Sequence, residues 1–383
     1  MQRFAVEIIQ DYKLQALEDD WLALERLGNA SVFRSWTWIS CWLAALPDEI
    51  QPLLVRVTLQ GRIVGLGFFC SAKLSGKFGK VGAFLLHETG NTNLDCLTVE
   101  HNGLLCDPAH EEDVISQVGR ALEDRKDWDE WVVSGIDSIT AVKFEELAAR
   151  MGWIVYESVN KPRHFLDLAK VKQLGDRLEW LSVNTRSQVR RALKDYGKRG
   201  EVKFELARTV DEALAFFDRL KYFHQCYWQS RAKQGAFELH LFEIFHRRFI
   251  EQSWSTNGVQ LARVSSGDHE IGYLYNLVHQ QTLYAYQSGF NYEKDAKVKP
   301  GLVSHVMAIE RAIADGFDCY DLLAGDGQYK RSLATDSEMM RWIRLRRPRI
   351  TFRLEALARK VRDRSRETFG ALFREPRGSP SNP

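Results

Sequence analysis

Residues 282–330 read TLYAYQSGFNYEKDAKVKPGLVSHVMAIERAIADGFDCYDLLAGDGQYK. The alternation of apolar and polar residues over Thr282–Ser288 predicts a strand, and a polar loop follows it. Lys299-Pro300-Gly301 opens an amphipathic pattern that predicts a helix ending at Gly316. A short apolar run, Cys319–Leu323, predicts a second strand. The order strand, loop, helix, strand indicates an α/β unit.

This order predicts an anion-binding site where the helix begins. The first backbone N–H groups of a helix have no intrahelical acceptor, and the helix dipole adds positive potential there. Pro300 suits a first helical turn, and Gly301 lets a ligand approach the backbone closely. Lys297 and Lys299 add positive charge. We predict that Lys299, Pro300 and Gly301 bind ligand phosphates; an ordinary helix cap with solvated lysines is the alternative.

The rest of the chain repeats one order of elements twice: helices, strand, turn, strand, strand, helix, strand. The two predicted hairpins share a detail, Ile63-Val64-Gly65 in one and Glu270-Ile271-Gly272 in the other. We predict an α/β (α+β) fold of two tandem modules, each a mixed, mostly antiparallel sheet flanked by helices. The modules span residues 1–165 (the first half) and 166–350 (the second half), and residues 351–383 form a tail. Two unrelated α/β domains are the alternative.

Some local expectations depend on short patterns. They are short strands at residues 94–99 and 102–106, separate strands at 154–158 and 163–167, a helix at 174–180, and a break near Tyr227 in the helix at 209–231.

Composition argues against several classes of protein. Six cysteines are scattered without a CxxC pair, which disfavours a zinc knuckle or a disulfide framework and fits a reducing compartment. The N-terminal apolar run, broken at Glu7, is too short for a signal peptide, and Ile63–Cys70 is far below the ~20 residues of a membrane helix. No HxxxH, GxSxG, P-loop or GxGxxG pattern occurs. We expect a cytoplasmic protein without a metal.

The end of the chain is basic. From Arg341 to Pro383 it holds 13 Arg and Lys against 4 Asp and Glu, which is 13 − 4 = +9. The whole chain has a net charge of +2, so residues 1–340, the acidic body, carry 2 − 9 = −7. Thr351–Phe373 can form a basic amphipathic helix, and Arg374–Pro383 is expected to be disordered. We expect this helix either to lie on an anionic membrane surface or to pack on the acidic body or a sister subunit.

These patterns together resemble a known family. A hairpin, a third strand, a Gly-marked helix and a parallel strand are the layout of GNAT acyltransferases, and two tandem copies resemble the FemAB-type arrangement. The stretch from Asn184 to Leu333 is similar to the acetyltransferase domain of the CelD type, which is associated with bacterial cellulose and exopolysaccharide synthesis. The similarity is carried by Tyr286-x-Ser288-Gly289-Phe290, Lys299-Pro300-Gly301, Tyr320-Asp321-Leu322 and Gly325-Asp326-Gly327-x-Tyr329-Lys330. Ordinary GNAT enzymes carry Q/R-x-x-G-x-G/A at the phosphate loop, whereas this chain has a single glycine there.

The resemblance implies acyl transfer from acetyl-CoA to an amine or hydroxyl. It implies that Tyr329 protonates the departing thiolate, and a tyrosine keeps its proton at neutral pH. Asp321, at the end of a strand, is predicted to act as a general base or to hold Lys330. His305 is a further catalytic candidate, and Lys330 is expected to pair with donor phosphate, a substrate carboxylate or Asp326. Structural packing, or a surface position for Lys330, is the alternative in each case.

A second set of residues is predicted to hold the acceptor. Asn184 caps a basic helix that would present Arg186 and Arg190 to an anionic acceptor such as a sugar nucleotide or a uronic acid. Another helix carries an aromatic and basic face that suits a sugar or nucleotide ring. Solvation of the first helix and core packing of the second are the alternatives. The predicted substrate-binding residues are Arg186, Arg190, Tyr227, Trp228, Tyr286 and Asp326, with Asp95 or Asn91 facing the acceptor from the first half.

The leading interpretation is an acyltransferase of polysaccharide or cell-envelope biosynthesis that acts on a small molecule or a glycan precursor, with no DNA partner. Two others stay open. A FemAB-like transferase would use an aminoacyl-tRNA, which the basic tail would contact, although the acidic body argues against a broad RNA surface. A non-catalytic pseudo-acyltransferase would bind glycan or act as a scaffold.

Overall fold

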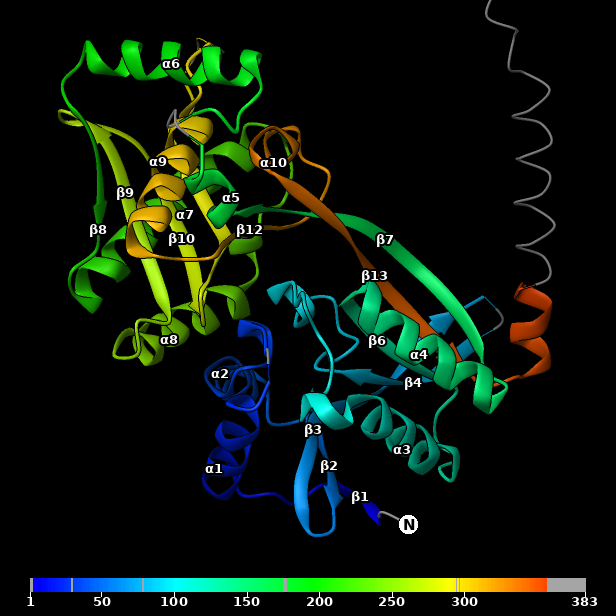
Figure 1. Cartoon of the computed structure of the whole chain (residues 1–383). Coiled ribbons are helices and arrows are strands. Elements are labelled where there is room, and N and C mark those ends of the chain that lie inside the picture. Colours follow the sequence, from blue (N-terminus) through cyan, green and yellow to red (C-terminus); the bar gives the residue numbers. More distant parts are fainter. Residues whose placement is uncertain are drawn as a thin grey trace, which may run out of the picture.

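The computed structural model describes residues 3–28, 30–77, 79–174, 178–293, 295 and 297–356. These residues form one continuous sheet with helices packed on it (Figure 1). The strands are β1 (Phe4–Ile9), β2 (Leu53–Leu59), β3 (Arg62–Gly76), β4 (Gly79–Leu86), β5 (Leu105–Cys106), β6 (Glu130–Asp137), β7 (Ile154–Asp167), β8 (Val202–Leu206), β9 (Val259–Ser266), β10 (His269–His279), β11 (Thr282–Phe290), β12 (Cys319–Ala324) and β13 (Asp336–Arg346). The α-helices are α1 (Leu14–Glu25), α2 (Trp36–Ala45), α3 (Glu111–Glu123), α4 (Ser138–Met151), α5 (Leu168–Lys172), α6 (Val183–Gly197), α7 (Val210–Gln229), α8 (His240–Trp254), α9 (Pro300–Asp315) and α10 (Gln328–Leu333).

The sheet confirms the predicted fold class. Its strand order is β1-β2-β3-β4-β6-β13-β7-β12-β11-β10-β9-β8, and β5 pairs with β3. Pairing within the described ladders is antiparallel except for β4 with β6 and β11 with β12, which are parallel. Each half therefore holds a hairpin, a third antiparallel strand and then a parallel strand, which is the repeated order that the sequence indicated.

Two long strands join the halves (Figure 1). β7 is one strand over residues 154–167, not the two separate strands expected, and it pairs with β13 along most of its length and with β12 near its end. β13 returns from the second half and lies between β6 and β7. The predicted module boundary near residue 165 lies inside β7, so each half contributes a strand to the neighbourhood of the other.

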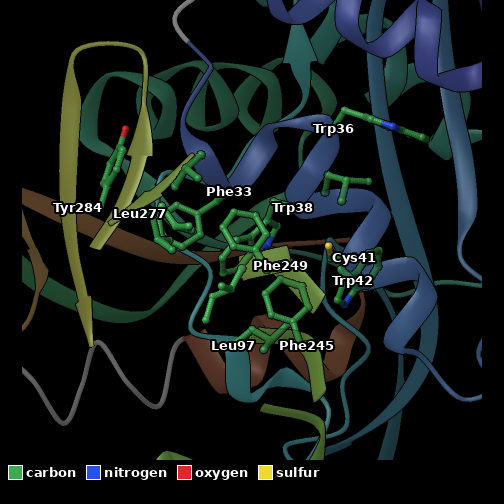
Figure 2. Close-up of a cluster of buried hydrophobic side chains, with 14 of the residues drawn as sticks. Phe33, Trp36, Trp38, Cys41, Trp42, Leu97, Phe245, Phe249, Leu277 and Tyr284 are labelled. Atoms are coloured by element: carbon green, nitrogen blue, oxygen red, sulfur yellow. The ribbon is translucent and has the colours of Figure 1, made fainter. Parts of the chain in front are cut away.

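A shared hydrophobic core also joins the halves. The Trp-rich helix α2 packs on α8, and the ring centroid of Trp38 lies 4.7 Å from that of Phe245 and 5.4 Å from that of Phe249. Figure 2 shows these rings with Phe33 and Tyr284, which come from different halves of the chain. Aromatic pairs at such distances stabilise the fold beyond the contribution from burying their apolar surface. Trp38 of α2 therefore connects the two halves.

Several local expectations are wrong. Residues 95–97 form a short 3₁₀ helix instead of a strand, because Asp95 accepts hydrogen bonds from the Thr89 and Gly90 N–H groups and closes a loop. The helix expected at 174–180 is absent from its described residues, 174 and 178–180; α5 ends earlier, at Lys172. α7 runs without a break through Tyr227.

The predicted tail helix is only partly described. Residues 350–356 are helical, with Phe352 buried and Leu354 exposed. Residues 357–383, which include most of the predicted amphipathic helix, lie outside the described residues. Of the helices that the structure does describe, none has the length and apolar character needed to cross a bilayer.

Candidate functional site

β11 and β12 diverge at the site. They pair in parallel only over Thr282–Tyr284 and Cys319–Asp321, after which β11 continues to Phe290 without β12 beside it. The register of β11 against β10 shifts between Ala285 and Gln287, which marks a bulge at Tyr286. The diverging strands open the sheet between them and leave one edge of β11 unpaired beyond Tyr284 in the described ladders.

A large cavity lies on one side of this opening. Its volume is about 1000 Å³, and we call it the outer cavity. It is lined by α7 residues, the loop at Gln234–Ala236, the end of β11, the N-terminus of α9, and Tyr329. This size lies at the upper end of ordinary ligand sites.

The N-terminus of α9 faces the outer cavity through Lys299, Pro300, Gly301 and Leu302. No side chain caps this helix. The first hydrogen bond of the helix runs from the Val303 N–H to the Lys299 carbonyl, and Pro300 has no N–H. Among the described residues no group accepts from the N–H groups of Gly301 and Leu302, so both can donate to an anion, and phosphate binding here stays a prediction. A Cβ on Gly301 would lie 3.1 Å from the Phe290 ring, so glycine also permits close packing there.

Aromatic side chains form one wall of the outer cavity. The ring centroids of Tyr227 and Tyr292 are 4.8 Å apart, and the Arg231 guanidinium lies 4.1 Å from the Tyr227 centroid. Trp228 donates from Nε1 to His224 Nε2 at 2.9 Å. The structure thus brings the predicted pair Tyr227 and Trp228 into the same cavity as Gly301.

A smaller cavity of about 180 Å³ lies next to it, and we call it the inner cavity. The two cavities share Ala236, Gln287, Ser288 and Tyr329 in their walls. The rest of the inner wall comes from both halves of the chain: Thr98, Glu100, Phe242, Ala285, Tyr286, His305, Leu322, Leu323, Ala324 and Lys330. The inner cavity therefore lies at the divergence of β11 and β12.

Tyr329 stands at the junction of the two cavities. Its side chain is 42% exposed, and its ring stacks on that of His305 with centroids 5.5 Å apart. Burial of part of the side chain raises the pKa of Tyr329 to about 12, so the phenol keeps its proton at neutral pH. A protonated phenol at this position is a proton donor to whatever occupies the junction.

His305 is buried in the wall of the inner cavity. Its Nδ1 forms a hydrogen bond with the Tyr320 hydroxyl at 2.9 Å, and its Nε2 has no partner among the described residues. Burial lowers the pKa of His305 to about 3, and the imidazole is neutral at pH 7. Because its outer nitrogen is unpaired, His305 can exchange a hydrogen bond with a ligand.

Lys330 lies in the inner cavity and does not line the outer one. Its Nζ donates to the carbonyl oxygens of Ala324 at 2.7 Å and Leu323 at 3.2 Å. Burial lowers the pKa of Lys330. An ammonium has three protons, so one remains after these two bonds. The structure thus places Lys330 apart from the N-terminus of α9, where a donor phosphate was expected.

Asp321 is fully buried behind the site. Its Oδ2 lies 2.8 Å from Arg163 Nε and 3.0 Å from His101 Nε2, and its Oδ1 accepts from the Leu323 N–H. It lines neither cavity. This geometry gives Asp321 a structural role at the seam between the halves, and Lys330 binds backbone carbonyls instead of Asp321.

Other predicted site residues have local partners. Arg186 donates to the carbonyls of Glu179 and Leu181, and neither Arg186 nor Arg190 lines the outer or the inner cavity. The Tyr286 hydroxyl donates to the Leu97 carbonyl, and Tyr286 lines the inner cavity. Asp326 pairs with Arg331 on the surface.

In the first half, Asp95 and Asn91 serve their own loop. The carboxylate of Asp95 accepts from Thr89 and Gly90, while the Asn91 side chain accepts from the Asn93 N–H. The residues that do reach the site from this half are Thr98 and Glu100. Sequence reasoning missed both, because they lie in an irregular loop and nothing in their own surroundings shows which distant strand they meet.

No group of three or more His, Cys, Asp or Glu side chains in the described part of the chain is arranged to hold a metal ion.

Comparison with known proteins gives a family match over part of the chain. Residues 183–331 match the family described as acetyltransferase (GNAT) domain, and this stretch holds α9, β11, β12 and Tyr329. Over these residues the chain is therefore similar to GNAT acetyltransferase domains. The search of curated proteins gives no match.

Solved structures resemble nearly the whole chain. FemX matches with a TM-score of 0.54 and 9% identity, covering 88% of this chain and 96% of its own. The C-terminal domain of a putative lysylphosphatidylglycerol synthetase from Agrobacterium fabrum matches with a TM-score of 0.53 and 9% identity, covering 88% and 93%. L-PGS from Bacillus licheniformis matches with a TM-score of 0.51 and 9% identity, covering 90% and 96%. At such identities these matches show a common fold and nothing finer.

Proposed function

We propose that this chain transfers an acyl group, in the first instance acetyl, from a CoA thioester to an amine or hydroxyl. The proposal starts from the match of residues 183–331 to the GNAT acetyltransferase domain family. One observation carries the proposal: an uncapped helix N-terminus and a proton-donating tyrosine border the same cavity, at the point where two parallel strands diverge.

The outer cavity fits the groups of a CoA ester. The N–H groups of Gly301 and Leu302 and the ammonium of Lys299 suit the phosphates. Tyr227, Tyr292 and Arg231 offer flat and cationic surfaces to a planar base. The unpaired edge of β11 beyond Tyr284 presents backbone groups to which the amides of an extended arm can bind. The volume of about 1000 Å³ accommodates a ligand of this size.

The residues at the junction match the needs of thioester cleavage. Attack by the acceptor forms a bond from its nitrogen or oxygen to the carbonyl carbon, and the carbon–sulfur bond then breaks. The leaving sulfur needs a proton, and Tyr329 holds one at neutral pH next to both cavities. The third Nζ proton of Lys330 and the unpaired Nε2 of His305 are groups that can stabilise charge on the carbonyl oxygen.

The biological setting of the reaction is inferred from the family resemblance and from residue composition. The CelD-type resemblance supports a role in polysaccharide or cell-envelope biosynthesis, with a small molecule or glycan precursor as acceptor. Residue composition supports a cytoplasmic location, and the basic tail supports peripheral contact with a membrane. These points stay proposals, as does the choice of acetyl over longer acyl groups.

Donor binding is the first test. We would measure thermal unfolding of the full chain with acetyl-CoA, free CoA and a long-chain acyl-CoA. A ligand at 100 times its dissociation constant that binds only the folded state adds about 2.7 kcal/mol. Acetyl-CoA should raise the melting temperature of the wild type but not of Gly301→Glu, which places a carboxylate at the helix N-terminus.

Lys299→Met and Lys297→Met form a matched pair of variants. Both remove one lysine charge close to α9, but only Lys299 lines the outer cavity. Lys299→Met should weaken acetyl-CoA binding about three- to tenfold, and Lys297→Met should change it little. If no CoA species stabilises the wild type, the proposal fails. Salt-sensitive binding of tRNA would then favour the aminoacyl-tRNA donor.

A further inference from the structure

A loop of the first half reaches into the inner cavity. Thr98 and Glu100, which line the cavity, follow the short 3₁₀ helix at Asp95–Leu97. Thr98 and His101 have φ values of 48° and 50°, a left-handed conformation that residues other than glycine seldom adopt. Such backbone strain persists only where the surroundings hold it in place, and it is common at functional sites.

The second half holds this loop in position. The Tyr286 hydroxyl donates to the Leu97 carbonyl, and His101 Nε2 bonds to Asp321 Oδ2 at 3.0 Å. The Ala324 N–H donates to Glu100 Oε2 at 2.6 Å. Three successive contacts thus fix the loop on β11 and β12, the two strands that form the site.

Glu100 itself is set up to meet a ligand. Its side chain is only 3% exposed, yet it borders the inner cavity. Its Oε2 has the Ala324 partner, whereas no described residue donates to Oε1. Among the described residues that line this cavity, Glu100 is the only carboxylate. Asp321 is already neutralised by Arg163, and Glu293 in the outer cavity is paired with Arg199.

We propose that Glu100 accepts the proton that the acceptor loses, so that the first half completes the active site of the second. The inference rests on the proposed acyl transfer. In the step, the acceptor nitrogen or oxygen forms a bond to the acyl carbon and gives its proton to Glu100. The carbon–sulfur bond breaks, and the sulfur takes the proton of Tyr329. The charge left on Tyr329 is neutralised when it recovers a proton from Glu100, directly or through solvent.

The electrostatic surroundings agree with this role. Burial raises the pKa of Glu100, and the nearby Asp321 carboxylate raises it further. The hydrogen bond from the Ala324 N–H and the charges of Lys330 and His101 lower it. The balance is a raised pKa, which makes Glu100 a stronger proton acceptor than an exposed glutamate. The other titratable groups that border the inner cavity are His305, which burial keeps neutral, Tyr329 and the buried Tyr286.

The test uses Glu100→Gln, which keeps an oxygen for the Ala324 N–H but cannot accept a proton. Release of the CoA thiol from acetyl-CoA would be followed with four acceptors: glucosamine, ethanolamine, hydroxylamine and water. A positioned base contributes about 10²–10⁴-fold to a rate. We expect the glucosamine and ethanolamine rates to fall at least about a hundredfold. The hydroxylamine rate should fall less, because this amine is already largely neutral at pH 7.

The pH profile separates a base from a structural carboxylate. The acid limb of the wild-type kcat/KM should contain two ionisations, that of the acceptor ammonium and that of Glu100, whereas the Glu100→Gln profile should contain only that of the acceptor. Glu100→Asp should recover part of the rate, since it restores a carboxylate with a shorter side chain. Glu88→Gln is the matched control. Glu88 also belongs to the first half and accepts a hydrogen bond from the Ser134 hydroxyl, but it lines neither cavity.

Each outcome is decisive. If Glu100→Gln melts like the wild type, binds acetyl-CoA and keeps its rate within about threefold at every pH, the role of Glu100 is overturned while the acyl transfer stands. A wild type that binds acetyl-CoA but transfers to none of the four acceptors also overturns it, because a placed base should at least activate water. A wild type that neither binds nor cleaves any thioester contradicts the proposed function itself.

Discussion

Arg163 Nε lies 2.8 Å from Asp321 Oδ2, and this ion pair joins β7 to β12 at the seam between the halves. The Asp321 side chain is 0% exposed and that of Arg163 is 13% exposed. Burial alone would raise the pKa of Asp321, but the charge of Arg163 and the hydrogen bond from His101 lower it to about 2. The carboxylate is therefore ionised throughout the range in which an enzyme works, and the pair is a structural link directly behind the inner cavity.

Replacing Arg163 by Met should destabilise the chain strongly. The change leaves the Asp321 carboxylate buried without its arginine partner, and breaking a buried pair in this way costs about 3–5 kcal/mol. Urea unfolding followed by circular dichroism measures the loss. Arg311→Met is the control, because Arg311 forms an exposed pair with Asp315 within α9 that is worth at most about 1 kcal/mol.

The Arg163–Asp321 pair also predicts how the free energy of unfolding changes at low pH. A carboxylate with a lowered folded pKa stabilises the fold above its unfolded pKa of about 3.9, and this contribution is lost as pH falls through about 2. The difference in stability between the wild type and Arg163→Met should therefore shrink between about pH 4 and pH 2. A constant difference over this range would contradict the assignment.

Asp321 also shows where prediction from sequence stops. Its position at the end of a strand is visible in the apolar run Cys319–Leu323, but Arg163 is 158 residues away and no local pattern points to it. Periodicity and glycine placement gave α9, β11 and β12 with their ends within a few residues, and with them Gly301 and Tyr329. These features depend on neighbours in sequence, so one segment is enough to predict them.

Contacts between the halves could not be predicted in this way. β7 reads as two short strands because Asn160-Lys161-Pro162 is polar and contains a proline, yet β13 pairs with the whole segment. The loop at Thr98 and Glu100 has no periodic pattern, and its importance appears only when it meets Ala324. Nothing in the aromatic residues of α2 shows that α8 packs on them.

Buried histidines predict a second pH effect. Burial lowers the pKa of His87 and His224 to about 4 and that of His305 to about 3. The unfolded chain protonates these groups below about pH 6.5 while the folded chain does not, so stability falls as pH drops from about 6.5 towards 4. Each group contributes about 1.4 kcal/mol per pH unit in this window. Glu88 has the opposite effect on stability, because its pKa is raised to about 7 in the folded chain and it binds a proton there before it does so in the unfolded chain. This effect involves one proton only.

His87→Asn tests this effect at one position. His87 has a φ of 56°, which asparagine tolerates, so the backbone should be retained. We expect the urea midpoint of this variant to depend less on pH between 6.5 and 4 than that of the wild type, whatever its stability at pH 7. His240→Gln, which changes an exposed histidine, should leave the pH dependence as it is.

Gly289 predicts a packing constraint on β11. A Cβ at this position would lie 2.2 Å from the Leu220 carbonyl oxygen in α7, and backbone cannot move aside as a side chain can. Gly289→Ala should destabilise the chain by about 1–3 kcal/mol or more. Gly197→Ala is the opposite case, since open space surrounds Gly197 at the end of α6, and it should stabilise by about 0.5–1 kcal/mol. Thermal unfolding of the two variants should move in opposite directions.

We expect Tyr329→Phe to lower the rate of acyl transfer without weakening the binding of acetyl-CoA. The phenylalanine ring can still stack on His305, so the wall of the two cavities should be preserved. The variant has no proton to give to the leaving sulfur, and kcat should fall about 10²-fold or more. Acetyl-CoA should still raise the melting temperature as it does for the wild type.

The pH profile of this variant is informative as well. Because the pKa of Tyr329 is raised to about 12, its ionisation cannot produce a fall in wild-type rate below about pH 11. A decline of the wild-type rate near pH 8 that disappears in Tyr329→Phe would contradict the raised pKa. A rate unchanged by the substitution at every pH would instead show that the leaving thiolate needs no proton from Tyr329, and solvent or Lys330 would have to supply it.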